Sequence, residues 1–245
     1  MIPKIIHYCW LSNDPIPKDM VVYMESWKKN LPEYEFVKWD FSRFPKDQSL
    51  WVKQAFEKKK YAFAADYIRL YALYTMGGIY LDMDVEVLKS YNPLLSLPAM
   101  FCYEANGCTI EAATMGAEKG SKWIKACLDY YKDKPFVNED GTLNMIPIPQ
   151  IMKTIFSNKY RIVEINGADI IPSNCVPVLS SDYFSPRSYA TGLLKITDNT
   201  YSIHQFSGSW LPWYVKAERT ICQKLGLRYR DILNRYINHK KQKLS

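Results

Sequence analysis

Several features that are common in other classes of protein are missing from this chain. Its cysteines form no Cys-x-x-Cys pair, and its first residues show no signal-peptide pattern. No apolar run approaches the ~20 residues of a membrane-spanning helix. We also find no internal repeat and no low-complexity segment. These absences argue against a disulfide-stabilised secreted protein and predict a soluble, cytoplasmic protein with reduced thiols.

The body of the chain has almost no net charge, although the whole chain carries +7. The excess lies in residues 216–245, which hold nine Lys or Arg and two acidic residues. A neutral body argues against nucleic-acid binding. The same segment has apolar residues at helical spacing, among them Ile221, Leu225 and Tyr236. Such a basic tail either packs on the domain with a solvated face or lies on an anionic membrane surface.

At 245 residues, with 48% apolar and 23% charged residues, the chain suits one large globular domain with an appendage. We expect the domain at residues 1–212 and the basic amphipathic helical tail at 213–245. In the first half, strands are predicted at 2–10, 34–39 and 79–81, and helices at 19–30, 50–60 and 62–76. In the second half, strands are predicted at 99–104, 109–115, 160–165, 176–179 and 194–203, and helices at 119–132 and 147–156. This order predicts an α/β fold with a mainly parallel sheet.

The most informative run of residues is Tyr80-Leu81-Asp82-Met83-Asp84, which follows a Gly77-Gly78 helix stop. Side chains alternate along a strand, so Asp82 and Asp84 are expected on the same side. Two carboxylates beside a loop suit a hard divalent cation that keeps open positions for phosphate oxygens. A solvated strand end without a metal would show the same triplet.

The helix before this run carries Asp66 and Arg69, which are three residues apart and therefore share a helix face. They could form a simple intrahelical ion pair. Because the rest of the helix is apolar, we expect the pair to face a polar cleft or a ligand. Asp66 could accept hydrogen bonds from sugar or ribose hydroxyls, and Arg69 could donate to sugar or phosphate.

A later segment, His204 to Trp210, combines an imidazole, a flexible glycine, two hydroxyls and an indole N–H. His204 is a candidate third ligand for a cation, although a lone histidine is often structural. Trp10, at the end of the first strand, could stack on a base or pack in the core. The segment offers the groups that the far wall of a metal–diphosphate site needs.

The sequence resembles one family in three blocks and three single residues. These are Ile2–Trp10, Ala64–Tyr71 and Gly77–Asp84, together with His204 and Ser209-Trp210. The chain is similar to glycosyltransferase family 32, whose sugar-binding region contains a DxD motif, and looks most like its bacterial capsule-type members. It resembles the glucosyltransferase domain of large clostridial toxins more distantly. The resemblance implies a GT-A fold with a Rossmann-like nucleotide-binding half and a mixed central sheet. It also implies Mn²⁺- or Mg²⁺-dependent transfer from a nucleotide sugar, with retention at the anomeric carbon.

The resemblance assigns roles to single residues. Metal ligands would be Asp82, Asp84 and His204. Donor-binding residues would be His7, Trp10, Asp66, Arg69, Tyr80, Asp82, Ser209 and Trp210. Candidates for the catalytic group are Asp84 and Arg69, with Glu104 and Asn106 at the reacting face of the sugar.

Two alternatives stay open. A haloacid-dehalogenase-type phosphatase also has an apolar strand that ends in Asp-x-Asp, but Glu86 stands where that family needs Thr or Val. An inactive family member that only binds a sugar nucleotide would keep the same residues. We predict a hexosyltransferase with a UDP-sugar as preferred donor and a saccharide or lipid-linked saccharide as acceptor, in capsule or surface polysaccharide synthesis. The tail would hold it at the inner face of the plasma membrane.

Overall fold

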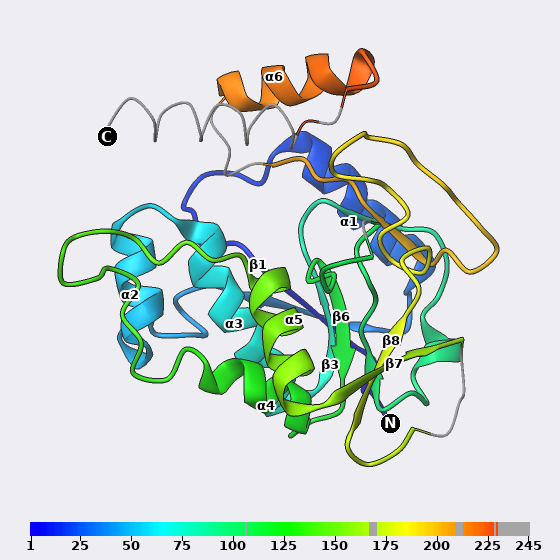
Figure 1. Cartoon of the computed structure of the whole chain (residues 1–245), viewed down its shortest axis with the longest axis horizontal. Helices are drawn as coiled ribbons and strands as arrows, with labels where there is room; N and C mark the ends of the chain where they lie inside the picture. The colour runs from blue at the N-terminus through cyan, green and yellow to red at the C-terminus, as the bar shows by residue number, and fades with distance from the viewer. Residues whose placement is uncertain (106, 167–170, 209–212, 228, 230–245) are drawn as a thin grey trace.

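The computed structural model describes residues 1–105, 107–166, 171–208, 213–227 and 229. At its centre lies a five-stranded sheet with the strand order β2-β1-β3-β6-β5 (Figure 1). Helices cover both faces of this sheet, so the expected α/β class is confirmed.

The sheet is parallel on one side and antiparallel on the other. β1 (Ile5–Cys9) pairs in parallel with both β2 (Glu35–Trp39) and β3 (Gly78–Leu81). β6 (Thr114–Ala117) pairs antiparallel with β3 and with β5 (Ala99–Met100). The sheet is therefore mixed, as the resemblance implied, and not mainly parallel. The reason is that no α-helix separates β3 from β6, whereas a parallel neighbour needs a long crossover.

Each face of the sheet has its own hydrophobic core. On one face, Ile79 and Leu81 of β3 share a core with Met20 and Trp27 of α1 (Lys18–Asn30). On the other face, Tyr80 shares a core with four helices. These helices are α2 (Leu50–Glu57), α3 (Tyr61–Met76), α4 (Lys122–Asp129) and α5 (Ile148–Lys159). Two short 3₁₀ helices, η1 (Lys46–Gln48) and η2 (Asn92–Leu94), lie in the connections.

A glycine pair joins α3 to β3. The N–H of Gly77 donates to the carbonyl of Leu73 at 2.9 Å and ends the helix. Gly78 has φ +106°, and a Cβ there would lie 2.7 Å from the carbonyl oxygen of Ile5. Only glycine fits this left-handed, crowded position. The turn sends the chain directly from α3 into β3, which brings the polar face of α3 to the end of that strand.

Two small two-stranded sheets flank the central one. β4 (Val85–Val87) pairs antiparallel with β9 (Ser202–His204), with Val85 opposite His204. β7 (Arg161–Ile165) pairs in parallel with β8 (Cys175–Leu179). The β4–β9 pair carries a late segment of the chain to the end of β3.

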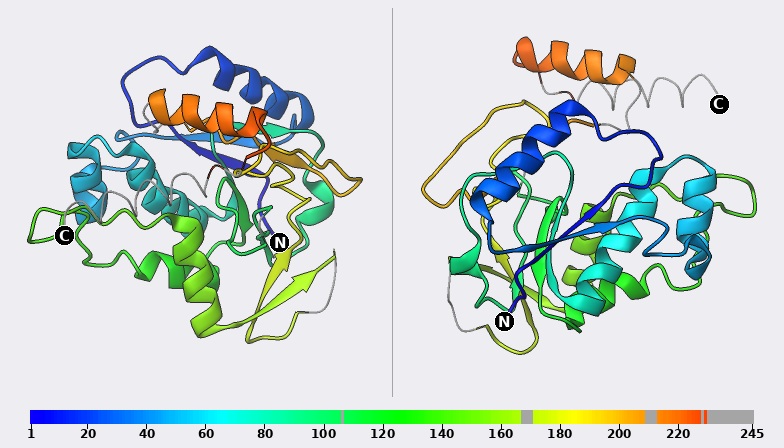
Figure 2. Two further views of the ribbon diagram at one scale, coloured as in Figure 1. Left: turned by 45° about the horizontal axis from the view of Figure 1, so that its top comes forward. Right: turned by 180° about the vertical axis from the view of Figure 1, so that it is seen from behind.

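The last described helix, α6 (Trp213–Lys224), lies at the outside of the molecule on the side of α1 (Figure 2). Gln223 Nε2 donates to the carbonyl of Tyr189 at 3.1 Å, and the N–H of Tyr229 donates to the carbonyl of Ala190 at 3.1 Å. The division of the chain at 212 and 213 stays a prediction. Within the part of the chain that the structure describes, no helix is long and apolar enough to cross a bilayer.

Candidate active site

The two aspartates lie in a turn between β3 and β4. β3 ends at Leu81, and the N–H of Val85 donates to the carbonyl of Asp82 at 3.1 Å. The alternation of side chains along a strand is therefore the wrong reason for their proximity. The turn itself brings Asp82 and Asp84 together at the end of the sheet.

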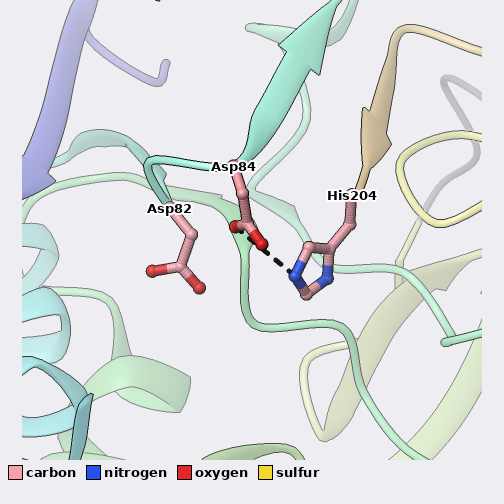
Figure 3. A group of neighbouring side chains, drawn as sticks. All are labelled: Asp82, Asp84 and His204. Atoms are coloured by element: carbon pink, nitrogen blue, oxygen red, sulfur yellow. Dashed lines mark ion pairs between the residues drawn. The ribbon is translucent and has the colours of Figure 1, made fainter. Parts of the chain in front are cut away.

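His204 completes a group of three potential ligands from two distant parts of the sequence (Figure 3). Because β9 pairs with β4, the imidazole Nε2 lies 3.6 Å from Asp84 Oδ1. One ligand atom from each of Asp82, Asp84 and His204 lies within 4.8 Å of the other two. All three side chains are half-buried, so the group can be reached from solvent. Two carboxylates and one imidazole suit a divalent cation such as Mn²⁺, and the donor set fits the predicted metal.

Behind His204 lies Glu111, a carboxylate that the sequence prediction missed. Its side chain is 1% exposed, and both of its oxygens lie 3.2 Å from His204 Nδ1. The N–H of Ala113 donates to the same carboxylate at 2.7 Å and fixes it. A hydrogen-bonded carboxylate leaves Nε2 facing the site and makes the imidazole a better ligand. The only signal in the sequence was an acidic residue inside the strand predicted at 109–115.

His204 and Glu111 each stabilise the ionised form of the other, and Asp84 also stabilises the ionised form of His204. Burial would lower the pKa of His204, but the negative charges of Glu111 and Asp84 outweigh it and raise that pKa. Burial would raise the pKa of Glu111, but the charge of His204 and its hydrogen bonds lower it. The site is therefore electronegative, and a divalent cation would replace the positive charge of a protonated imidazole.

The segment after His204 folds against Asp84. The N–H of Ser207 donates to Asp84 Oδ2 at 2.8 Å, and the N–H of Gln205 donates to the carbonyl of Asp84 at 3.0 Å. Ser207 is a second contact that the sequence prediction missed, because a backbone donor leaves no trace in residue type. Ser209 and Trp210, predicted at the diphosphate, lie outside the described residues.

Arg69 joins the pair on α3 to the aspartate turn. Its guanidinium contacts Asp66 Oδ1 at 3.1 Å and Asp82 Oδ2 at 3.2 Å, and it donates to the carbonyl of Ala112 at 2.8 Å. The hydroxyl of Tyr80 donates to Asp82 Oδ1 at 3.0 Å. The α3 pair is thus more than an intrahelical ion pair, since Arg69 and Tyr80 orient Asp82 from behind. Of the predicted donor-binding residues, the structure brings Asp66, Arg69, Tyr80 and Asp82 together.

Burial dominates the titration of these carboxyls. It raises the pKa of Asp66 to about 7, although the charge of Arg69 acts in the opposite direction. It also raises the pKa of Asp82, again against Arg69. A cation at the aspartate turn would favour the ionised form of Asp82.

His7 and Trp10, also predicted to bind the donor, are placed differently. His7 is 0% exposed; its Nε2 donates to the carbonyl of Gly77 at 2.7 Å, and its Nδ1 accepts from the Trp39 indole at 3.1 Å. Both ring nitrogens are therefore used within the core. The Trp10 indole N–H donates to the carbonyl of Asp14 at 2.8 Å and ties down the loop after β1. Trp10 also packs against the hydrophobic core on the α1 side of the sheet, and its contact with a base stays a prediction.

Glu104 lies in a short loop after β5. Its backbone N–H donates to the carbonyl of Thr109 at 2.9 Å, and its carboxylate accepts from the Thr109 hydroxyl. Its neighbour Asn106 lies outside the described residues. Their assignment to the reacting face of the sugar stays a prediction.

Comparison with known proteins identifies the family. Residues 17–100 match the glycosyltransferase sugar-binding region that contains a DXD motif. An uncharacterized glycosyltransferase of Acanthamoeba polyphaga mimivirus, L373, is 33% identical over 225 residues, covering 86% of this chain and 85% of that protein. The chain belongs to this family of DXD-containing glycosyltransferases.

Two yeast proteins match over shorter stretches. Mannosyl phosphorylinositol ceramide synthase SUR1 of Saccharomyces cerevisiae is 34% identical over 207 residues, 78% of this chain. Inositol phosphoceramide mannosyltransferase 3 of Schizosaccharomyces pombe is 34% identical over 127 residues, 50% of this chain. The matches span 49% and 35% of those two proteins. Among solved structures, the PaToxG glycosyltransferase superimposes with a TM-score of 0.49 and 20% identity, covering 64% of this chain and 69% of that one.

Proposed function

We propose that this glycosyltransferase moves a hexose, with retention at the anomeric carbon, from a nucleoside diphosphate sugar to a saccharide acceptor, and that it needs a divalent cation. The observation that carries the proposal is the group of Asp82, Asp84 and His204, with Glu111 behind it. A UDP-sugar is the donor to test first.

Each residue of the site has a task in this proposal. Asp82, Asp84 and His204 would hold Mn²⁺ or Mg²⁺, which when bound supplies a Lewis acid that stabilises the departing diphosphate. Arg69 orients Asp82 through its 3.2 Å contact. Asp66, next to Arg69, would accept hydrogen bonds from donor hydroxyls. The face of Trp10 would stack on the base.

The acceptor belongs to the proposal as well. The names of the yeast relatives refer to mannosyl transfer and to inositol phosphoceramide, a lipid. We take this as support for a lipid-linked acceptor and for mannose as one hexose to test. Synthesis of capsule or other surface polysaccharide is the narrower form of the same idea.

The decisive experiment is thermal unfolding with UDP, GDP or no nucleotide, each with Mn²⁺ or with EDTA. A ligand at a hundred times its dissociation constant adds ~2.7 kcal/mol to the free energy of unfolding. We expect such stabilisation with UDP and Mn²⁺ together, and none with EDTA. Asp84→Asn keeps the shape of the side chain but removes its charge, so the Mn²⁺-dependent stabilisation should disappear.

The matched control is Asp129→Asn on α4, because Asp129 is an exposed acid whose partner is Lys125 on the surface. This variant should respond to UDP and Mn²⁺ like the wild type. Stabilisation by GDP in place of UDP would correct the donor. An absence of stabilisation by either nucleotide would contradict the proposed donor site.

A further inference from the structure

The helix α6 has the opposite orientation to most surface helices, because its polar side faces the protein and its apolar side faces outward. The side that faces the protein is largely polar: Gln223 bonds to the backbone of Tyr189, and the guanidinium of Arg219 lies 5.4 Å from the ring centre of Tyr189. Cys222 is the buried apolar contact on that side. Amphipathic helices on protein surfaces normally show the opposite arrangement, with their apolar side inward.

The outward side of α6 is apolar. Trp213 and Ile221 are 80% and 58% exposed and are eight residues apart on α6, so they share a helix face, and Leu225, directly after the helix, is 67% exposed. Tyr214 and Leu227 are exposed next to them. Together with Ala217, the acidic Glu218 and the edge of the buried Cys222, these residues line one shallow, mainly apolar hollow. We call this set of side chains, Trp213, Tyr214, Ala217, Ile221, Leu225 and Leu227, the α6 outer face.

Contiguous exposed apolar patches on soluble proteins mark sites of interaction, and the charge around this one indicates the partner. Lys216 and Lys224 lie on α6, and residues 216–245 hold nine basic and two acidic residues, equal to the whole net charge of +7. Exposed Trp and Tyr beside basic residues are typical of helices that lie in the interface between water and an anionic lipid layer.

We propose that the α6 outer face docks on an anionic membrane surface, with α6 parallel to the membrane and its apolar side chains among the lipid headgroups. Attraction between the basic C-terminal segment and anionic lipids would bring the helix to the surface, and burial of Trp213, Ile221 and Leu225 would hold it there. A second copy of this chain fits the same face poorly. It would bring another +7, and twelve-residue helices give little of the ~800 Å² per partner that a stable interface buries.

This inference goes beyond sugar transfer and does not need it. If the proposed lipid-linked acceptor is also correct, docking would place the enzyme on the surface that holds its substrate. Because vesicle binding requires neither donor nor cation, failure of one proposal is distinguishable from failure of the other.

The test is co-sedimentation of the full chain with phosphatidylcholine vesicles that contain or lack phosphatidylglycerol, at low and high salt. We expect binding to the anionic vesicles only, weakened by salt. The triple variant Trp213→Ser, Ile221→Ser, Leu225→Ser keeps every basic residue, and its affinity should fall roughly tenfold or more. Because the replaced side chains are exposed, the variant should keep its unfolding temperature.

The matched control removes three exposed apolar side chains elsewhere, Leu50→Ser, Met145→Ser and Ile146→Ser, on α2 and in the loop before α5. Its vesicle affinity should equal that of the wild type. An equal fall in both triple variants, or no fall in the α6 variant, would overturn the proposal. A wild-type protein that is dimeric, does not bind vesicles and becomes monomeric in the α6 variant would also overturn the proposal. The α6 outer face would then join two copies of the chain.

A second measurement does not depend on how the triple variant folds. Wild type and Trp213→Phe are compared for tryptophan fluorescence quenching by vesicles made with brominated anionic lipid. We expect quenching in the wild type that exceeds quenching in Trp213→Phe, because Trp213 would lie at the depth of the lipid headgroups. Equal quenching in the two proteins would show that Trp213 does not enter the membrane and would overturn the proposed orientation.

Discussion

His7 and His204 are the two histidines of the described structure, and their surroundings have opposite effects. His7 lies between a backbone carbonyl, which accepts its Nε2 proton, and the indole of Trp39, which donates to its Nδ1. His204 lies between two carboxylates, Asp84 on one nitrogen and Glu111 on the other. Burial lowers the pKa of His7 to about 4, whereas the charges around His204 raise its pKa above the usual value.

The comparison shows that burial alone does not decide what an imidazole can do, because charged partners can reverse the effect of burial on its pKa. One acceptor and one donor match the neutral ring and hold it in place, so His7 fastens β1 to the Gly77 turn and to β2. Two carboxylates instead match a positive charge, which a proton or a bound cation can supply. Three substitutions test this contrast.

The largest effect is expected from His204→Ala. Loss of one of the three protein ligands should weaken Mn²⁺ binding roughly a thousandfold. This is more than the ten- to hundredfold loss that is typical when a residue hydrogen-bonded to a metal ligand is removed. The measurement is Mn²⁺ binding by electron paramagnetic resonance, without nucleotide or substrate. His7→Gln is the control and should bind Mn²⁺ as the wild type does. Equal Mn²⁺ affinity in His204→Ala and wild type would remove His204 from the cation site.

The second effect concerns the stability of the fold around His7. A histidine with a pKa of about 4 in the folded protein and about 6.5 in the unfolded chain contributes stability that is fully present above pH 6.5. That stability is lost as the pH falls from 6.5 to 4, because over this range the unfolded chain binds a proton that the folded protein does not. The loss should amount to about 3 kcal/mol.

Urea unfolding between pH 4 and pH 7 measures this loss as a difference between wild type and His7→Gln. Glutamine can donate and accept hydrogen bonds but does not titrate in this range. The variant should be less stable at pH 7 and should lose less of its stability toward pH 4. Parallel curves for the two proteins would show that His7 is not held in its neutral form.

The smallest of the three effects is expected from Glu111→Gln. The amide keeps the size of the side chain and an oxygen that can accept from His204 Nδ1, but it removes the negative charge. We expect Mn²⁺ binding to weaken roughly ten- to hundredfold, with a change in unfolding temperature no larger than that of a conservative core substitution. Glu164→Gln, an exposed acid on β7, should leave Mn²⁺ binding unchanged. If Glu111→Gln and Glu164→Gln bind Mn²⁺ equally well, the charge of Glu111 does not contribute to Mn²⁺ binding.

Local patterns predicted the helices and the centre of the sheet well. The helix predicted at 62–76 runs from Tyr61 to Met76, because small apolar residues and a glycine stop define it locally. The strand predicted at 109–115 begins only at Thr114. The residues before Thr114 include Glu111, whose backbone N–H still donates to the carbonyl of Cys102 while its side chain contacts His204. Apolar composition alone could not show that difference.

The part of the site that depends on the type of each side chain could be predicted from the sequence. The acidic pair, Arg69 and His204 stood out as charged or ligating side chains near apolar segments, and the structure brings them together. The core role of His7 was not predictable, because its partners lie on β2 and in the Gly77 turn. The contact of Ser207 with Asp84 was not predictable either, since it uses a backbone N–H.

The short pairing of β4 with β9 affects the order in which parts of this protein can fold during synthesis. Asp84 and Ser207 are 123 residues apart in the sequence, yet they meet at the candidate cation site. Contacts between such distant segments form late in folding, because the intervening chain must first be ordered. Synthesis proceeds from the N-terminus, so β1, β3 and the aspartate turn leave the ribosome long before their partner strand. A nascent chain can therefore build the central sheet early but completes the candidate cation site, including the contact of Ser207 with Asp84, only after residue 207 has emerged.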